Sequence, residues 1–429
     1  MVVQGCAGGV SSQDAAGYDG HLAAGDYPGA AAFAIGAGQV APDGRSANLL
    51  WSLNAGAAMV YSGDGARTVP VLDHAEEMMK LRDVGTTGEM GQYRAKTYDG
   101  VMVNTYKAMA ALQAGDRNTA RTELLRAEDR QARAEREFEA EAAADRARRG
   151  QGAGVDLQGA LRNVQSDATF RQASAEISNS GGYAPFINPF ATYLAGLYFL
   201  NTEDSNRDRA RAAFLSVSRI VGRNPQLSAD IVLAQGSGRF SPKTWVIFEN
   251  GQGSTIEQYS ITFPVPIVGR RSGVSVATVA LPRLRENAPA ARALLVGDRQ
   301  QPTTVVGNFD YVMRSEFQRR YPAIMAMAVA EAALKIAVQN VAAQEKSGLA
   351  LLAATVVSQV STADTRSWTA LPKDFQVARI ETPKDGIVRL RMEGYMELQS
   401  AKVPTDVSSI VYVKAFRAGS PPAVHVLRF

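Results

Sequence analysis

The sequence predicts an α+β protein in which an irregular array of helical hairpins precedes a mainly antiparallel β domain with a two-helix insertion. Three observations indicate this. Small residues and turn glycines recur at helical spacing in the first half, β-branched and aromatic residues dominate from residue 240, and a long apolar helical stretch interrupts the second half. We expect a flexible tail at 1–16, a helical repeat domain at 17–227 and an α+β domain at 240–429, with the helical insertion at about 311–360.

Composition indicates a globular protein without a nucleic-acid partner. The 429 residues are enough for two or three domains. Hydrophobic residues make up 46% and charged residues 21%, which is enough apolar surface to form buried cores. Lys and Arg number 46 against 42 Asp and Glu. This near balance lacks the concentrated positive field that binds nucleic acid.

The one cysteine, Cys6, excludes an intrachain disulfide and a zinc cluster of thiolates. With Gly5 before it and Val3 three positions earlier, it resembles the bacterial lipobox, whose cysteine receives a diacylglycerol. The resemblance implies a membrane anchor on Cys6, and Ala7 in place of Asp implies the outer membrane, facing the periplasm. Met1 leaves no room for a signal peptide, so we expect a leader upstream. If Met1 is the true start, the chain is cytoplasmic instead.

Four segments of the first half share one pattern: a small residue, a turn, and then small and large apolar residues on a second helix. A weaker copy begins at Gly25, and the other copies place these residues at Gly56, Gly63 and Ala75; at Ala108, Gly115, Ala120 and Ala127; and at Gly196, Ala210 and Phe214. The pattern resembles the tetratricopeptide repeat (TPR), in which small side chains let paired helices approach closely. An unrelated antiparallel bundle is the alternative.

The spacing of the turns predicts a short array and not a regular superhelix. Gly25, Gly63 and Gly115 are 38 and then 52 residues apart, so insertions interrupt the repeat. We expect the array to present a concave groove to a segment of another envelope protein. One insertion, about 117–154, begins with charges of both signs at helical spacing, which predicts a long solvated helix. It ends in a glycine linker at 150–154, because no strand precedes these glycines as a dinucleotide site requires.

The second half carries strand and hairpin signals. Residues 245–248 run into Asn250-Gly251, a strong hairpin signal, so we expect 255–263 to return beside them. Pro264 and Pro266 are expected to end that strand. The remaining expected elements are a strand at 274–281 closed by Pro282, the helical hairpin at 311–360, and strands at 375–380, 387–392, 410–416 and 423–429.

Three segments extend the resemblance beyond the repeats. Residues 245–253 (WVIFENGQG), 279–284 (VALPRL) and 363–372 (ADTRSWTALP) are similar to those of an uncharacterised family of bacterial lipoproteins. That family pairs an N-terminal tetratricopeptide-like region with a C-terminal β-rich domain. The resemblance implies an envelope location and no catalytic activity.

Two groups of residues are candidates for an interaction patch. Asp364, Arg366 and Trp368 lie close together in the sequence, and an Arg fork beside a Trp face suits recognition of a partner. The alternative, which we favour, is that Asp364 and Arg366 form an ion pair that holds the helix-to-strand junction, with Trp368 in the core. Glu249 and Asn250 complete the candidate patch, although Glu249 is expected to be a turn residue and not an acid catalyst.

Catalytic signatures are missing from the sequence. His21, His74 and His425 are scattered, and there is no HExxH, Gly-x-Ser-x-Gly or Walker motif. We therefore expect a non-enzymatic protein-interaction scaffold of the envelope, without a cofactor or a metal. The alternative is an enzyme acting on envelope polymers with paired carboxylates in a cleft between the two halves.

Overall fold

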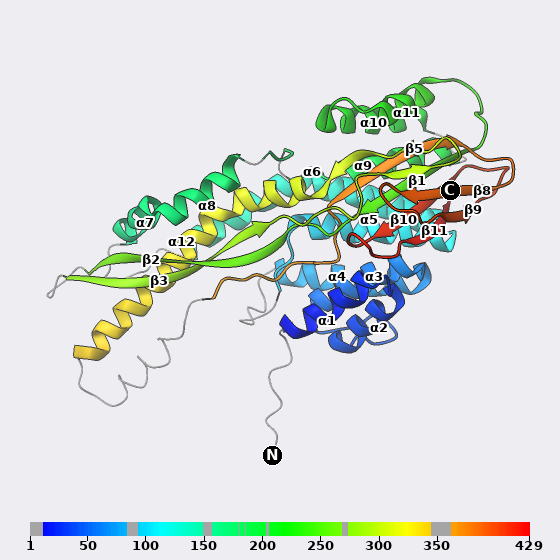
Figure 1. The fold of residues 1–429 in the computed structure, drawn as a ribbon. Coiled ribbons are helices and arrows are strands. Elements are labelled where there is room, and N and C mark those ends of the chain that lie inside the picture. The colour runs from blue at the N-terminus through cyan, green and yellow to red at the C-terminus, as the bar shows by residue number, and fades with distance from the viewer. Residues whose placement is uncertain are drawn as a thin grey trace, which may run out of the picture.

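The computed structural model describes residues 12–83, 93–148, 157–179, 181–184, 186–202, 206–267, 273–344 and 362–429. It confirms the α+β class, with helices in the first half and sheets in the second (Figure 1). The helices before the first strand are α1 Ser12–Ala23, α2 Tyr27–Gly38, α3 Leu49–Ser62, α4 Gly65–Asp83, α5 Thr97–Ala114, α6 Arg117–Arg148, α7 Leu157–Ser166, α8 Ala168–Asn179, α9 Pro189–Asn201, α10 Arg207–Val221 and α11 Pro225–Gln235.

Helices α1 to α6 form three consecutive hairpins, each turning at a glycine followed by an aspartate. Gly25, Gly63 and Gly115 have φ of +72°, +81° and +79°, the left-handed region in which glycine ends a helix without strain. The aspartate that follows then caps the N-terminus of the second helix. In α2, for example, the Asp26 carboxylate accepts a 2.9 Å hydrogen bond from the amide of Gly29. Helices α9 and α10 pack as a fourth hairpin.

Small residues let the paired helices approach closely, as the sequence predicts. A Cβ atom on Gly56 would lie 2.3 Å from Cδ2 of Leu72, and one on Gly196 would lie 2.6 Å from Cε1 of Phe214. Either contact would require the facing side chain or its helix to shift. The other predicted packing residues are also buried, namely Ala75, Ala108, Ala120, Ala127 and Ala210.

The boundaries of the helical half differ in part from the prediction. Helix α1 begins at Ser12, so the predicted tail at 12–16 is wrong, because Tyr18 and Leu22 anchor this helix in the core with no exposed surface. The long charged helix is confirmed as α6, where Arg133 bonds Asp129 at 2.9 Å along the solvent side. Cys6 and the glycines at 150–154 lie outside the described residues.

The strands form three sheets. Five strands are ordered β11-β10-β1-β7-β6, β2 pairs with β3, and four more are ordered β5-β4-β8-β9. All described pairs are antiparallel except β1 with β10, which run parallel in register Val246 to Val411. The strands are β1 Lys243–Asn250, β2 Thr255–Ile267, β3 Gly273–Arg285, β4 Leu294–Val296, β5 Gln301–Pro302, β6 Thr304–Asn308, β7 Asp374–Glu381, β8 Ile387–Met392, β9 Gln399–Lys402, β10 Ser409–Ala415 and β11 Ala423–Arg428.

The predicted hairpin at Asn250-Gly251 is wrong, because β1 pairs with β10 and β7 and not with β2. The Asn250 side chain is buried and accepts a 3.0 Å hydrogen bond from the amide of Ala290. It also donates to the carbonyl of Ala291 at 3.0 Å. These distant partners fix the end of β1 and direct the chain away into a separate hairpin.

Pro264, Pro266 and Pro282 lie inside β2 and β3, so the prediction that they end strands is also wrong. Among the described residues these two strands pair only with each other. Each strand therefore has an edge where a proline removes no ladder hydrogen bond, which is where prolines are tolerated in sheets.

The helical insertion is a single long helix in the described chain, α12 Phe309–Gln344. It confirms the first helix of the predicted pair, whereas the second falls within 345–361, outside the described residues. Together α12, the β2–β3 hairpin, α7 and α8 extend from the body as what we call the arm (Figure 1). The arm has its own hydrophobic core, which includes Val164, Phe263, Val279 and Tyr321.

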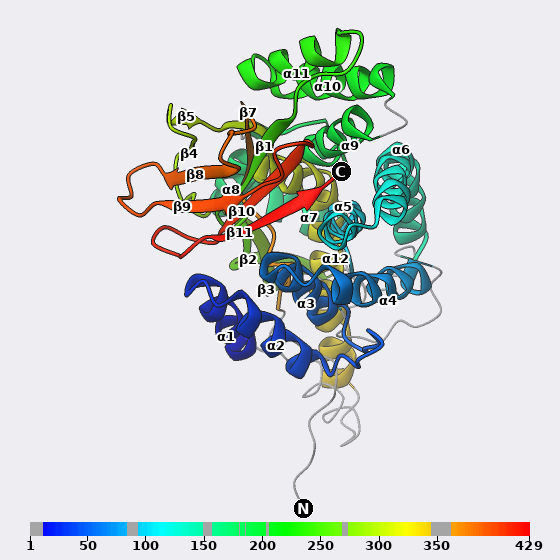
Figure 2. The same ribbon diagram turned by 90° about the vertical axis from the view of Figure 1, so that its right-hand side faces the viewer.

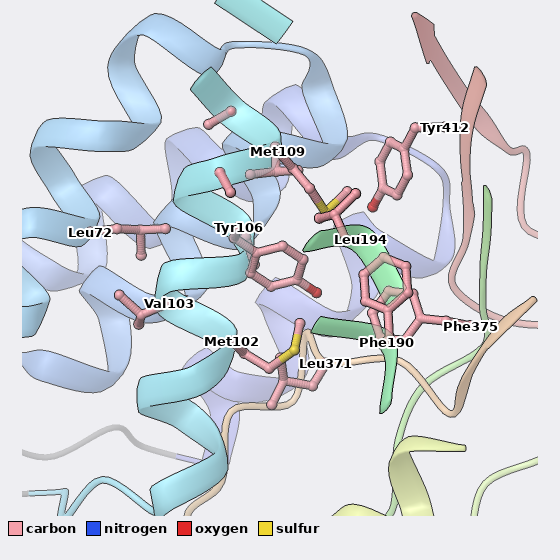
Figure 3. Packing of buried hydrophobic residues seen from close by; sticks show 14 of the residues in the cluster. Leu72, Met102, Val103, Tyr106, Met109, Phe190, Leu194, Leu371, Phe375 and Tyr412 are labelled. Atoms are coloured by element: carbon pink, nitrogen blue, oxygen red, sulfur yellow. The ribbon is translucent and has the colours of Figure 1, made fainter. Parts of the chain in front are cut away.

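The inner face of the helical array is filled by the protein's own sheet. Figure 2 shows the hairpins curving around β1, β10 and β11. Every residue from Leu49 to Tyr61 of α3 and from Tyr98 to Leu112 of α5 is buried. Figure 3 shows Tyr106 pointing toward Phe190, Phe375 and Tyr412. The expected open groove along this face is therefore wrong, and the predicted parts 17–227 and 240–429 share one core.

Within the described ranges, no helix combines the length and the apolar character needed to cross a lipid bilayer.

Candidate functional site

A cavity of about 360 Å³ lies in the arm, between α12 and one face of the β2–β3 hairpin. We call it the arm groove. Its volume is within the range of small-molecule binding sites. Most of its lining is apolar, and charged side chains gather near one end.

The floor of the arm groove is one face of the hairpin. Ile256 of β2 lies opposite its register partner Leu284 of β3. Pro282 and Ala280, two and four residues before Leu284, lie on the same face of β3. Side chains on a strand alternate between faces, so Leu281, which lies between Ala280 and Pro282, points the other way, into the core of the arm. The hairpin therefore presents an apolar surface on both faces.

The wall of the arm groove is one side of α12. Met313, Phe317, Ile324 and Met327 line it, spaced so that they follow one side of the helix. A neighbouring stripe, which includes Met325, packs into the core of the arm. Met327 is 42% exposed, so part of this apolar wall faces solvent.

At the charged end, Glu316 of α12 caps the first turn of α5. Its carboxylate accepts hydrogen bonds from the amides of Thr97 at 2.8 Å and Tyr98 at 3.1 Å. Such amides carry the positive end of the helix dipole, so a carboxylate there is stabilised. Nε of Arg320 donates to the same carboxylate at 2.8 Å. The charge of Glu316 is thus fully engaged within the fold.

Asp364 is the second carboxylate of this end, and Arg366 holds it. Nε and Nη2 of Arg366 donate to its two oxygens at 2.8 and 2.9 Å. Burial raises the pKa of Asp364, but the paired Arg366 outweighs this and keeps the pKa below its ordinary value. Asp364 therefore remains ionised in its ion pair.

Lys96 and Arg94 add positive charge at the same end. The Lys96 ammonium donates to the carbonyl of Arg94 at 3.3 Å. Burial lowers the pKa of Lys96, and Arg320 lowers it further against the opposing effect of Asp364. An anion bound at this end would therefore favour the charged form of Lys96.

Residues 362–364 form the remaining border of the arm groove. The amide of Ala363 donates to Oε1 of Gln258 on β2 at 3.0 Å, which ties this segment to the hairpin. The arm groove is thus built from segments that are far apart in the sequence, from Arg94 to Asp364.

The predicted interaction patch does not form one exposed surface. The favoured Asp364–Arg366 tie is confirmed, and Trp368 is buried, with its ring 5.6 Å from that of Tyr106. Glu249 and Asn250 are completely buried in β1, so the prediction of Glu249 as a turn residue is wrong. Of the five predicted patch residues, only Asp364 lines the arm groove.

Glu249 belongs to a buried polar cluster that sequence reasoning missed. Tyr61 and Tyr106 donate to its Oε1 at 2.8 and 2.9 Å, and Tyr412 donates to its Oε2 at 2.7 Å. The Lys414 ammonium lies 3.2 Å from Oε1. These five side chains, the tyrosine cluster, come from two helices and two strands and join the helical half to the sheet.

Among the residues with described placement, no three His, Cys, Asp or Glu side chains are grouped so that they could hold a metal ion. The three histidines are each engaged locally, as when Nε2 of His425 lies 2.7 Å from the carbonyl oxygen of Tyr61.

No protein-family model, no curated protein and no solved structure matches this chain.

Proposed function

We propose that this chain is a non-enzymatic binding protein of the bacterial cell envelope, anchored through a lipid on Cys6, and that its binding site is the arm groove. One observation carries the proposal: a cavity with an apolar floor and wall opens beside charged groups that the fold itself holds in place. Concave, mostly apolar sites with few polar groups are typical of ligand binding.

The hydrogen bonds already made by Glu316 and Asp364, the two carboxylates at the charged end, disfavour an enzyme that acts on envelope polymers. Such enzymes need one carboxylic acid with a raised pKa beside a second, free carboxylate. Asp364 has a lowered pKa in its pair with Arg366. Glu316 is occupied by two backbone amides and Arg320. Both side chains are thus held by hydrogen bonds within the fold, and the pKa of Asp364 is shifted away from that of a general acid.

Binding can be tested with N-phenyl-1-naphthylamine, a neutral apolar dye whose fluorescence rises in apolar surroundings. We expect the full chain to bind the dye and Ala323→Trp to abolish binding, because Ala323 lines the arm groove and indole would fill it. Ala326→Trp is the matched control, since Ala326 lies on the same helix outside the lining. Equal binding by the two variants would contradict the proposed site.

A second variant guards against misfolding of Ala323→Trp. Met327→Glu places a charge in the arm groove at a position already 42% exposed, so the fold should tolerate it. Leu334→Glu is its control, because Leu334 is 57% exposed and lies outside the lining. We expect the dye to bind the second variant and not the first, with equal melting temperatures.

The anchor can be tested separately by metabolic labelling with a radioactive fatty acid in bacteria that express the gene with its own upstream sequence. We expect label in the natural chain and none in Cys6→Ser. An upstream sequence without an in-frame basic and apolar leader, or label that persists in Cys6→Ser, would contradict the anchor.

A further inference from the structure

We propose that the arm groove holds the hydrocarbon chain of a single-chain anionic lipid, with the anionic head beside Lys96, Arg94 and Arg320. This inference rests on the proposed function and names the class of ligand. It follows from three properties of the site: an elongated lining that is mainly apolar, positive charge at one end, and a floor made of side chains and not of backbone groups.

The apolar lining is elongated along α12. The α12 side of the lining runs from Met313 to Glu331, about 27 Å of helix at 1.5 Å per residue. Glu316 and Arg320 lie at its charged end, and apolar side chains line it from Ala323 to Ala328. A cavity of about 360 Å³ spread along such a wall suits a thin, flexible guest better than a broad ring system. The side chains along it are mainly aliphatic, such as Ile256, Leu284 and Ile324, and they offer a hydrocarbon chain contact without polar partners.

Positive charge concentrates at the end where α5 begins. Three cations, Arg94, Lys96 and Arg320, line this end. Two carboxylates of the lining lie beside them: Glu316 is bound by Arg320 itself, and Asp364 by Arg366, which is outside the lining. The lining cations at this end therefore outnumber the lining carboxylates by one. At the far end the lining contains Glu331 instead. A guest with an anionic head is therefore oriented in one direction along the arm groove.

A peptide guest fits the arm groove poorly. The floor is the side-chain face of the hairpin, whereas the N–H and C=O groups of β2 and β3 lie in the plane of the sheet, directed at the facing strand or at the outer edges of the hairpin and not into the arm groove. Apart from the turn at Pro322, which has no N–H to donate, the backbone groups of α12 bond within the helix. A peptide laid on these surfaces would bury its own N–H and C=O groups without partners, at a cost of about 1–3 kcal/mol each.

The test measures displacement of N-phenyl-1-naphthylamine from the full chain by amphiphiles below their micelle concentrations. The anionic probes are palmitate and hexadecyl phosphate, which separate a carboxylate head from a phosphate head. Hexadecan-1-ol provides the same chain with a neutral head, and hexadecyltrimethylammonium provides a cationic one. We expect an anionic probe to displace the dye at least tenfold more tightly than the alcohol and the cation.

Substitution of Lys96 then tests the position of the head. We expect Lys96→Gln to weaken the preferred anionic probe about tenfold and to leave the alcohol unchanged. Lys402→Gln is the control, because Lys402 is an exposed lysine of β9, outside the lining. The readout is the ratio of the two dissociation constants within each variant, so a general loss of stability does not imitate the result.

Each failure has a separate meaning. Equal affinity for palmitate, hexadecyl phosphate and the alcohol would overturn the head site. If Ala323→Trp blocks dye binding but no amphiphile displaces the dye from the natural chain, the proposed lipid ligand is wrong and the arm groove remains the binding site. Slow thiol labelling of Met327→Cys compared with Leu334→Cys, both in a Cys6→Ser chain without probe, would show a groove already covered and would overturn both proposals.

Discussion

The phenol of Tyr106 on α5 donates a 2.9 Å hydrogen bond to Oε1 of Glu249 on β1, across the boundary between the helical half and the sheet. Both side chains are fully buried, and so is Lys414, the cation that neutralises Glu249. A buried carboxylate is stable only when its charge and lone pairs are satisfied. Tyr61, Tyr412 and Lys414 complete that requirement here.

The tyrosine cluster predicts a large stability cost for Glu249→Ala. The substitution leaves Lys414 buried without its counter-ion and removes the acceptor of three phenols, so we expect a loss of about 3–5 kcal/mol in the free energy of unfolding. Urea denaturation followed by circular dichroism measures it. Glu381→Ala is the matched control, because it breaks an ion pair with Lys243 in which Glu381 is exposed, and should cost under about 1 kcal/mol. Equal costs would contradict the assigned role of the cluster.

The shared core predicts that the helical half and the five-stranded sheet open together. Trp51 of α3 and Trp245 of β1 belong to the same hydrophobic cluster, whereas the arm has a separate one. Native-state hydrogen exchange should therefore give the same opening free energy for the amides of α3, α5, β1 and β10. The amides of β2 and β3 should exchange through a smaller opening. If α5 opened about 1.4 kcal/mol more easily than β1, a tenfold difference in the opening equilibrium, the two halves would be independent.

Alanine substitution should have opposite effects on stability at Gly56, which lies in a close helix contact, and at Gly36, which does not. Gly56→Ala would place its Cβ 2.3 Å from Leu72, so we expect a loss of about 1–3 kcal/mol from overpacking. A methyl group added at Gly36 on α2 would meet nothing within 4 Å, so Gly36→Ala should gain about 0.5–1 kcal/mol. Thermal unfolding of the two variants checks the signs. A neutral Gly56→Ala would contradict the steric role of the small residue.

Asp99 predicts an unusual dependence of stability on pH. Burial raises its pKa to about 7, and its Oδ1 lacks a hydrogen-bond partner among the described residues. The unfolded chain releases this proton near pH ~4, so from about pH 4 to 7 the folded state binds more protons. The free energy of unfolding should therefore fall as pH rises through this window, by at most about 1.4 kcal/mol per pH unit.

The Asn substitution isolates the contribution of Asp99. Asp99→Asn keeps an acceptor for the Tyr93 phenol and the Lys96 amide but cannot ionise. Urea denaturation at about pH 5 and about pH 7.5, on either side of most of this window, should show a smaller loss of stability in this variant than in the natural chain. Asp374, whose pKa burial raises to about 6, adds a slope of the same sign to both proteins. Identical slopes in the two proteins would contradict the assignment.

Local signals predicted the helical hairpins well and the sheet less well. A glycine such as Gly63 ends a helix through its own backbone angles. Close packing at Gly56 depends on one facing side chain in the next helix, so nearby residues in the sequence predict both features. Asn250-Gly251 is an equally strong local signal, but the side chain of Asn250 bonds residues as distant in the sequence as Ala290 and Asp374. The parallel pairing of β1 with β10 likewise joins segments far apart in the chain, which no local pattern records.

The arm groove could not be predicted from the sequence, because it too is formed by segments that are far apart in the chain. Its border runs from Arg94 to Asp364, and Asp364 is the one residue of the predicted patch that belongs to it. The usable signal was on α12, where Met327 and Leu334 fall outside the stripe that packs into the arm core. A helix that is apolar on more than one side needs a second partner.

Hydrogen bonds connect the two ends of the described chain. The Ser420 hydroxyl donates to the carbonyl of Ala23 at 2.7 Å, and the Tyr27 hydroxyl donates to the carbonyl of Lys414 at 3.1 Å. During synthesis the helices emerge before β10 and β11, the strands that cover Tyr27, Tyr61 and Tyr106. A nascent chain stopped before residue 409 would leave these aromatic rings in water. The core shared by the helices and the sheet therefore cannot close until β10 and β11 have been synthesised, and the exposed rings make a shorter nascent chain prone to aggregation.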